Sequence, residues 1–313
     1  MTKLYIAAVV LRLHEQGMME LSEPVVGYLP ERLARGLHVL DGVDYTNQLT
    51  LVHLLGHLSG LPDWLDERPP GAKSLVDELV EDGARVWTCE DAVTRARDRL
   101  TPHFPPSDPA SAKPRIRYSD TNYQLLTVVA EHVTGEPMAV LYDKHLFAPL
   151  KLARTWLPGD SPKARVDDPA TPWSGDQPLQ RPSAMVSFKD LYATTDDVLS
   201  FGQAWARGTL FDDPATHELM RHRYHTFGLP TSIAALRAPS WPIQDSLGVM
   251  RFAPSRIAAG GRRIPPLLGH TGATGSWMWH VPDLGVVVAG TVDQSSAVAV
   301  PFRLVPRALS ALA

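Results

Sequence analysis

The pattern of apolar residues changes character near Asp245, and this change constrains the fold more than any other feature of the chain. Before it, apolar residues recur mainly at helical spacing. After it, short β-type runs alternate with turns rich in glycine or proline; the runs are Leu247 to Phe252, Leu267 to Thr271, Ser276 to Val281 and Val286 to Val292. Helices followed by consecutive strands predict an α+β fold, in which an antiparallel meander is covered by helices.

Helical patterns fill most of the first two thirds of the chain. The predicted helices are a segment from Leu4 to Gln16, then Glu31 to Gly36, Leu49 to Leu61, Ser74 to Asp82, Glu90 to Leu100, Thr121 to Val133, Met138 to Leu146, and Asp190 to Arg207 with Thr194 or Thr195 as an internal N-cap. Residues 158–182 hold six prolines and show little periodicity, which is more typical of a binding loop than of a connecting segment without function. A last helix, Ala297 to Leu312, contains Pro301 and Pro306, so we expect it to be broken or kinked.

Composition excludes several classes of protein. The 313 residues carry 30 Lys and Arg against 34 Asp and Glu, so no basic surplus is available for a nucleic-acid partner. The single cysteine, Cys89, rules out an internal disulfide framework and a cysteine-rich metal site. The apolar run Leu4 to Val10 is far shorter than the roughly 20 residues of a membrane span, and we interpret it as part of a buried helix. Neither oligomeric state nor localisation follows from these observations.

Three short stretches carry the chemistry. They are Met1-Thr2-Lys3 at the start of an apolar helix, Tyr118-Ser119-Asp120 directly before another helix, and His270-Thr271-Gly272 on a predicted strand. Each is weak alone, and Tyr45-Thr46-Asn47 shows how readily such a match arises by chance. Their order, spacing and surroundings make the combination informative.

In that order the stretches resemble the penicillin-recognising serine hydrolases, which include class C β-lactamases, DD-peptidases of the penicillin-binding-protein type, and related esterases and D-amino-acid peptidases. The resemblance covers nearly the whole chain. The matching stretches are Thr2-Lys3-Leu4 to Gly17, Glu23-Pro24-Val25 with Tyr28-Leu29-Pro30, His53-Leu54-Leu55 with His57 and Ser59-Gly60-Leu61, Tyr118 to Leu126 with Val133-Thr134-Gly135, Phe147 to Leu150, and Leu268 to Gly272. It implies a β-lactamase/transpeptidase-like fold with a helical subdomain.

The resemblance also implies functional residues. They are Lys3, Tyr118, Asp120 and His270 as catalytic residues, and Thr271, Gly272 and Ala273 as substrate-binding residues. In such a site the Lys amine is the general base for a serine hydroxyl, and the Tyr phenol relays a proton to or from the leaving group. The main-chain N–H of Ala273 would help to bind the oxyanion. No metal or organic cofactor is implied, and the partner is a small-molecule or peptide substrate.

The family's nucleophilic serine stands three positions before its lysine, which here is the position directly before Met1. We expect that the chain starts at an internal Met of a Ser-Met-Thr-Lys motif, and that the family's N-terminal strands also lie upstream. The codon directly before Met1 tests this expectation, because any codon other than one for serine would refute it. The alternative is a truncated, non-catalytic remnant or binding module on the same fold. A nucleophilic Thr2 is disfavoured, because adjacent residues do not share a helical face.

Two departures from the family pattern bear on the substrate. Asp120 stands where many relatives have Asn, and its charge would favour the ammonium form of Lys3. His270 stands where β-lactamases usually have Lys, and imidazole is mostly neutral above its reference pKa of about 6.5. We therefore expect a preference for esters or small amides over anionic β-lactams.

Purely structural interpretations compete with these roles. Lys3 could be a solvated terminal residue, Tyr118 a residue at the core edge, His270 a satisfied strand histidine, and Asp120 a helix cap. His53 and His57 are four residues apart, but Leu54 occupies the place where a zinc hydrolase needs glutamate, which favours structural roles.

We predict one domain over residues 1–313. Its sheet part comprises about 1–45 and 240–313, its helical subdomain comprises about 46–239, and the cleft lies at their junction.

Overall fold

The computed structural model describes residues 1–69, 71–75, 86–159, 169–178, 186–227, 243–257 and 259–311. Its α-helices are α1 (Thr2–Glu15), α2 (Glu31–Ala34), α3 (Leu51–Leu55), α5 (Cys89–Arg99), α6 (Asp120–Thr134), α7 (Met138–Tyr142), α8 (Ala148–Leu150), α10 (Thr195–Ala206), α11 (Pro214–Leu219) and α13 (Pro301–Ser310). Short 3-10 turns are η1 (Val25–Tyr28), η2 (Thr46–Gln48), η4 (Pro282–Leu284) and η5 (Ser295–Ala297), and η3 (Asp143–Phe147) is a π-helix.

Six strands form one antiparallel sheet in the order β12-β11-β10-β9-β8-β7. They are β7 (His225–Thr226), β8 (Ile243–Asp245), β9 (Met250–Phe252), β10 (Leu267–Thr271), β11 (Trp277–Val281) and β12 (Val286–Gly290). Strands adjacent in sequence are adjacent in space, which confirms the predicted meander and α+β class. The remaining strands form the pairs β1 (Val39–Leu40) with β2 (Val43–Asp44), β3 (Thr155–Trp156) with β6 (Tyr192–Ala193), and β4 (Trp173–Ser174) with β5 (Gln177–Pro178).

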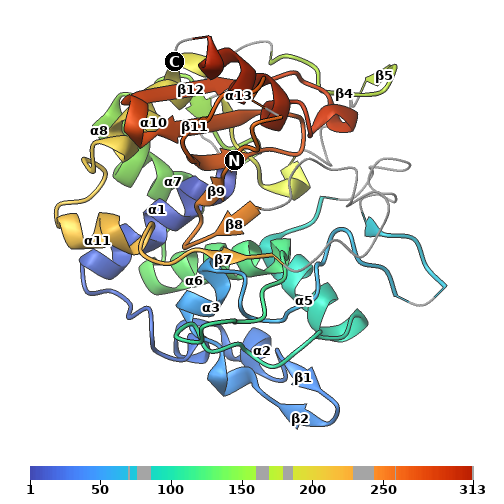
Figure 1. Ribbon diagram of the computed structural model, residues 1–313. Coiled ribbons are helices and arrows are strands. Elements are labelled where there is room, and N and C mark those ends of the chain that lie inside the picture. Colours follow the sequence, from blue (N-terminus) through green and yellow to red (C-terminus); the bar gives the residue numbers. More distant parts are fainter. Residues whose placement is uncertain are drawn as a thin grey trace.

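Alternation along β11 directs its side chains to two layers of helices. Trp277 and Trp279 are buried in a cluster with Phe302 of α13. Met278 points to the opposite face, where a Cβ added at Gly202 of α10 would lie 2.9 Å from its sulfur. Figure 1 shows the sheet with α10 and α13 at one end of the molecule, α3, α5 and α6 in the middle, and the β1–β2 hairpin at the other end.

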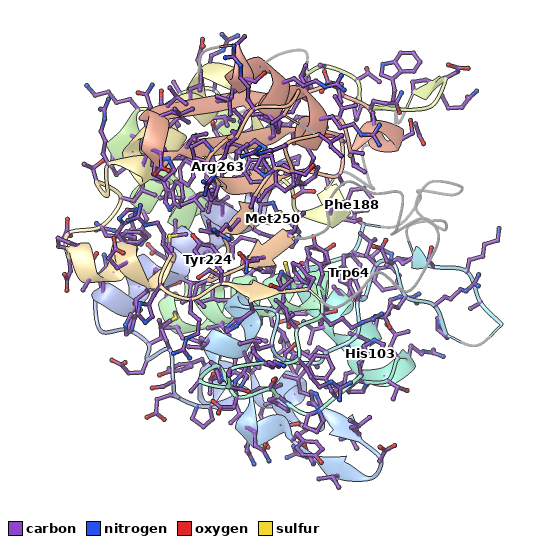
Figure 2. The ribbon with its side chains drawn as sticks, viewed as in Figure 1. Trp64, His103, Phe188, Tyr224, Met250 and Arg263 are labelled. Atoms are coloured by element: carbon purple, nitrogen blue, oxygen red, sulfur yellow. The ribbon has the colours of Figure 1, made fainter. Side chains whose placement is uncertain are left out.

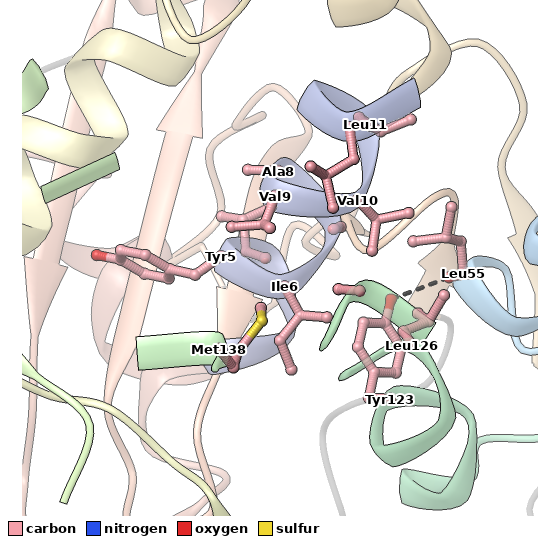
Figure 3. Packing of buried hydrophobic residues seen from close by; sticks show 14 of the residues in the cluster. Tyr5, Ile6, Ala8, Val9, Val10, Leu11, Leu55, Tyr123, Leu126 and Met138 are labelled. Carbon is pink, nitrogen blue, oxygen red and sulfur yellow. Dashed lines mark hydrogen bonds between the residues drawn. The ribbon is translucent and has the colours of Figure 1, made fainter. Parts of the chain in front are cut away.

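Helix α1 is the centre of the largest core cluster. Ten of its residues are buried, which is why its sequence is apolar on nearly every side. It packs against Leu126 of α6 and Met138 of α7, and the Tyr123 hydroxyl donates to the Leu55 carbonyl beside it, at 3.0 Å (Figure 3). The first residues of the chain therefore lie inside the molecule, beside the sheet (Figure 1).

Several predicted boundaries were wrong. Helix α3 ends at Leu55, not Leu61, because Gly56 caps it and His57 turns to the left-handed region with φ +55°. The predicted helix from Asp190 begins only at Thr195; the Thr194 hydroxyl caps it, which confirms that expectation, and strand β6 precedes it. Most of the helix predicted over Ser74 to Asp82 lies outside the described residues.

The C-terminal third also differs in detail. Strand β9 begins at Met250, not Leu247, because the Ser246 N–H bonds the Val249 carbonyl in a tight turn. The last helix starts at Pro301, where proline is tolerated in the first turn, and it continues past Pro306. Within the described residues, no helix has the length and apolar character needed to cross a membrane. The division into a sheet part and a helical subdomain stays a prediction.

Candidate active site

Lys3, Tyr118 and Asp120 meet where the first turn of α1 faces the start of α6. The Lys3 ammonium contacts the Asp120 carboxylate directly, and the Tyr118 hydroxyl donates to the same carboxylate oxygen at 3.2 Å. The Lys3 nitrogen also lies 5.0 Å from the Tyr118 ring centroid. Three residues singled out by two separate motifs are thus brought into one cluster.

The charges in this cluster hold each other in their ionised forms. Burial alone would lower the pKa of Lys3, but the carboxylate of Asp120 raises it well above its usual value. The same ion pair outweighs burial at Asp120 and lowers the pKa of its carboxyl. Burial and the Asp120 charge raise the pKa of Tyr118, so its phenol stays protonated. In the resting site the lysine is an ammonium ion and the phenol is a proton donor.

Strand β10 brings the third motif, His270-Thr271-Gly272, to the start of α1. The Met1 nitrogen donates to the Thr271 carbonyl at 3.0 Å, and the same oxygen lies 2.6 Å from Nδ1 of His270. A carbonyl oxygen accepts only, so Nδ1 of His270 carries its proton. Burial and the nearby positive charges at Met1 and Lys3 lower the pKa of His270 well below its usual value. His270 is therefore a neutral imidazole.

The turn after β10 holds the two remaining predicted binding residues. The Gly272 N–H donates to the Ser276 carbonyl, and a Cβ added at Gly272 would lie 3.7 Å from the Met1 nitrogen. The N–H of Ala273, which is exposed, has no hydrogen-bond partner within the part of the chain that the structure describes. Of these two N–H groups, that of Ala273 is therefore the one that can donate to an incoming oxygen.

Residues 57–64, which we call the supporting loop, hold the start of α6 by hydrogen bonds. The Pro62 carbonyl accepts from the hydroxyls of Ser119 and Thr121, at 2.9 and 2.6 Å. The Asp63 carboxylate accepts from the N–H of Asp120 at 2.8 Å. The close approach needs glycine: a Cβ at Gly60, whose φ is +73°, would lie 2.0 Å from the Phe104 carbonyl oxygen.

Two further carboxyl groups at the site escaped the sequence analysis. Asp63 is buried, and burial together with the Asp120 charge raises its pKa to about 7. Asp190 is half-buried, and its charge helps to raise the pKa of Lys3. Asp63 follows the matched stretch Ser59-Gly60-Leu61 within three residues, so reading that stretch further would have found it. No sequence signal marked Asp190.

An apolar cluster supports the end of the supporting loop. Trp64 is buried against Leu75, Ala92 and Ala96, with Trp87 and Phe188 packed against this cluster. Trp64 and Phe188 are labelled in Figure 2. The Trp64 N–H also donates to the Thr121 hydroxyl at 3.0 Å. Among the described residues, no three His, Cys, Asp or Glu side chains come together in a way that would hold a metal ion.

Known proteins resemble this chain in sequence over about half or nearly all of its length. The family model described as Beta-lactamase matches residues 1–310. Esterase EstB from Burkholderia gladioli is 34% identical over 156 residues, which cover 48% of this chain and 35% of that protein. An N-acetylmuramyl-L-alanine amidase from Bacillus subtilis (strain 168) is 28% identical over 157 residues, covering 49% and 31%. These matches thus span only about a third of each of the two relatives.

Solved structures show the same fold along the whole chain. The D-amino acid amidase from Ochrobactrum anthropi SV3, complexed with D-phenylalanine, superposes with a TM-score of 0.71 at 22% identity, covering 99% of this chain and 90% of that one. A D-stereospecific amidohydrolase from Streptomyces sp. gives a TM-score of 0.66 at 24% identity, covering 97% and 84%. At these identities the likeness establishes the fold alone.

Proposed function

The chain belongs to the β-lactamase family, and on this premise we propose that it forms the site of a serine hydrolase that transfers the acyl groups of small esters or amides to water. One observation carries the proposal: the Met1 nitrogen lies against β10, at the Thr271 carbonyl. A serine directly before Met1 would be joined to this nitrogen. It would thus stand between the third motif and the cluster of Lys3, Tyr118 and Asp120.

The proposed reaction divides proton handling between two residues. The serine oxygen attacks the substrate carbonyl carbon while its proton passes to the amine of Lys3, which must first lose its own proton. The Ala273 N–H stabilises the oxyanion. Tyr118 donates a proton to the leaving group as the bond to it breaks, and the proton that Lys3 took from serine passes to Tyr118, which leaves an acyl-serine ester. Water then attacks this ester and gives a proton to Lys3, which returns it to the serine oxygen as the acid is released.

The charges at the site favour esters and small amides over anionic β-lactams. Neutral His270 offers no positive charge to a substrate carboxylate. The carboxylates of Asp120 and Asp190 add negative potential beside Lys3. The esterase and the two amidases that this chain resembles fit this substrate class.

Three proteins test the proposal: the chain as it stands, the chain with a serine directly before Met1, and the chain with an alanine there. Intact mass after treatment with a fluorophosphonate should show one adduct in the serine protein only, and peptide mapping should place it on the added serine. That protein should also hydrolyse p-nitrophenyl acetate and leave nitrocefin nearly untouched. Absence of both adduct and turnover in a folded serine protein would contradict the proposed activity. Comparable nitrocefin turnover would contradict the substrate class.

A further inference from the structure

His57 contacts three consecutive residues around Tyr118. Its main-chain carbonyl accepts from the Arg117 N–H at 3.0 Å, and its Nδ1 accepts from the Ser119 N–H at 3.2 Å. Between these bonds, its ring lies against the Tyr118 ring, with centroids 4.7 Å apart and planes 31° from parallel. One residue therefore holds the backbone on both sides of Tyr118 and also the aromatic ring itself.

The hydrogen bonds define the protonation state of this imidazole. Nδ1 also lies 3.1 Å from Nδ2 of Asn122, whose amide is oriented by the Ser59 hydroxyl donating to its oxygen at 2.6 Å. A nitrogen that accepts from two N–H groups carries no hydrogen, so the hydrogen is on Nε2. Burial and the Lys3 charge lower the pKa of His57 to about 3, and the ring stays a neutral acceptor at ordinary pH.

The other edge of the ring faces a second buried residue. Nε2 of His57 lies 3.9 Å from Oδ2 of Asp245 on β8, too far for a hydrogen bond, and both side chains are buried. Neither Nε2 nor the Asp245 oxygens have a hydrogen-bond partner among the described residues. The hydrogen bonds of the His57 ring are therefore both made with the start of α6, through Ser119 and Asn122.

The backbone of His57 is held in a conformation that a side chain disfavours. Its φ of +55° lies in the left-handed region, which is uncommon for any residue other than glycine, although asparagine, aspartate and histidine occupy it more often than the others. Such conformations persist only where the surroundings impose them, and they concentrate at functional sites. Here the left-handed turn directs both the carbonyl and the imidazole of His57 toward residues 117–119.

We propose that His57 is the positioning residue for Tyr118, and that it keeps the phenol at the place from which a leaving group is protonated. This inference rests on the proposed function, because it assigns Tyr118 the role of proton donor. His57 itself touches neither substrate nor reacting atoms. Its loss should therefore impair only those reactions that need a proton from Tyr118.

The test compares leaving groups in the protein with a serine before Met1. His57→Gly suits the left-handed backbone and removes the imidazole; His57→Asn also suits it and returns an acceptor near the position of Nδ1. His53→Ala is the matched control, because His53 lies four residues earlier, on α3, and bonds Thr50 instead. The readout is kcat/KM for an ethyl ester, whose leaving group needs a proton, and for the p-nitrophenyl ester, whose leaving group does not.

His57→Gly should lower kcat/KM for the ethyl ester on the order of 100-fold, and for the p-nitrophenyl ester less than about threefold. His57→Asn should recover most of the lost kcat/KM for the ethyl ester. His53→Ala should change kcat/KM for both esters by the same factor. Equal losses for both esters in His57→Gly would mean a merely structural role and would overturn the proposal. A crystal structure of His57→Gly gives a readout independent of activity: the Tyr118 hydroxyl should move away from Asp120, from which it is now 3.2 Å distant. If the hydroxyl does not move, the proposed role of His57 is wrong, whether or not the serine protein is active. Inactivity of the serine protein would by itself contradict only the proposed function.

Discussion

Lys3 and Asp120 form an ion pair between the first turns of two helices, α1 and α6, that are more than a hundred residues apart in sequence. The pair holds the lysine in its charged form. A charged amine accepts no proton, so the contact that assembles the site also limits the proposed general base.

Replacing Asp120 by Asn should make the site more active at neutral pH. Asn keeps an oxygen that accepts from Tyr118 and removes the negative charge that raises the pKa of Lys3. In the serine protein, the rising limb of kcat/KM against pH should therefore move to lower pH by at least about one unit. Asp283→Asn, an exposed change of charge elsewhere, should leave the profile in place. A limb that stays in place or moves to higher pH in Asp120→Asn would contradict Lys3 as the base.

A positive charge at position 270 should change the substrate preference. His270→Lys would place a cation near a substrate carboxylate, whereas His270→Gln stays neutral as the control. The ratio of nitrocefin to p-nitrophenyl acetate turnover should rise on the order of tenfold in His270→Lys and stay unchanged in His270→Gln. Stopped-flow or plate absorbance measures both substrates. An equal ratio in the two variants would show that this position does not face the substrate carboxylate.

Asp245 should make the stability of the wild-type chain fall as pH rises. Burial raises its folded-state pKa well above the usual value, so the native state binds a proton that the unfolded state has lost. Its contribution to stability is complete below about pH 4 and is lost as pH rises toward the folded-state pKa. Asp245→Asn should remove this loss, so the variant should gain stability relative to wild type between pH 4 and pH 8 in urea unfolding. A constant difference between the two proteins would show that Asp245 is ionised in the fold.

Gly60→Ala should destabilise the fold severely, because the added methyl group would meet the Phe104 carbonyl oxygen at 2.0 Å. Gly42→Ala is the matched control: its φ of +79° imposes a similar backbone strain, but a Cβ there meets nothing within 4 Å. We expect Gly42→Ala to lower the free energy of unfolding by about 1 kcal/mol and Gly60→Ala by at least about 3 kcal/mol. Similar losses would mean that the supporting loop relaxes around the methyl group.

The sequence was informative where chemistry is encoded locally. Tyr118 and Asp120 stand two residues apart at a helix start, and the short run that holds His270 lies between two prolines and a glycine-rich turn, so motif and element could be predicted together. Asp245 and His57 belong to distant elements, and nothing in either neighbourhood indicates that they face each other. The two-residue β7 is too short to show any periodicity.

Helix α3 shows a second limit of prediction. Its apolar pattern continues to Leu61, but the chain leaves the helix after Leu55 because the carbonyl and imidazole of His57 bond residues 117 and 119. Tertiary hydrogen bonds thus override a local helical pattern, and such bonds cannot be predicted from spacing.

The outer position of β12 has a practical consequence for all of these measurements. Within the described residues this strand pairs only with β11, so the main-chain N–H and C=O groups along its other side are open to a strand from a second molecule. Two copies that joined in this way would scatter light and lower the amount of free enzyme without altering a single catalytic distance. Protein concentration therefore has to be varied in the kinetic comparisons, so that reversible self-association is not mistaken for an effect of a substitution.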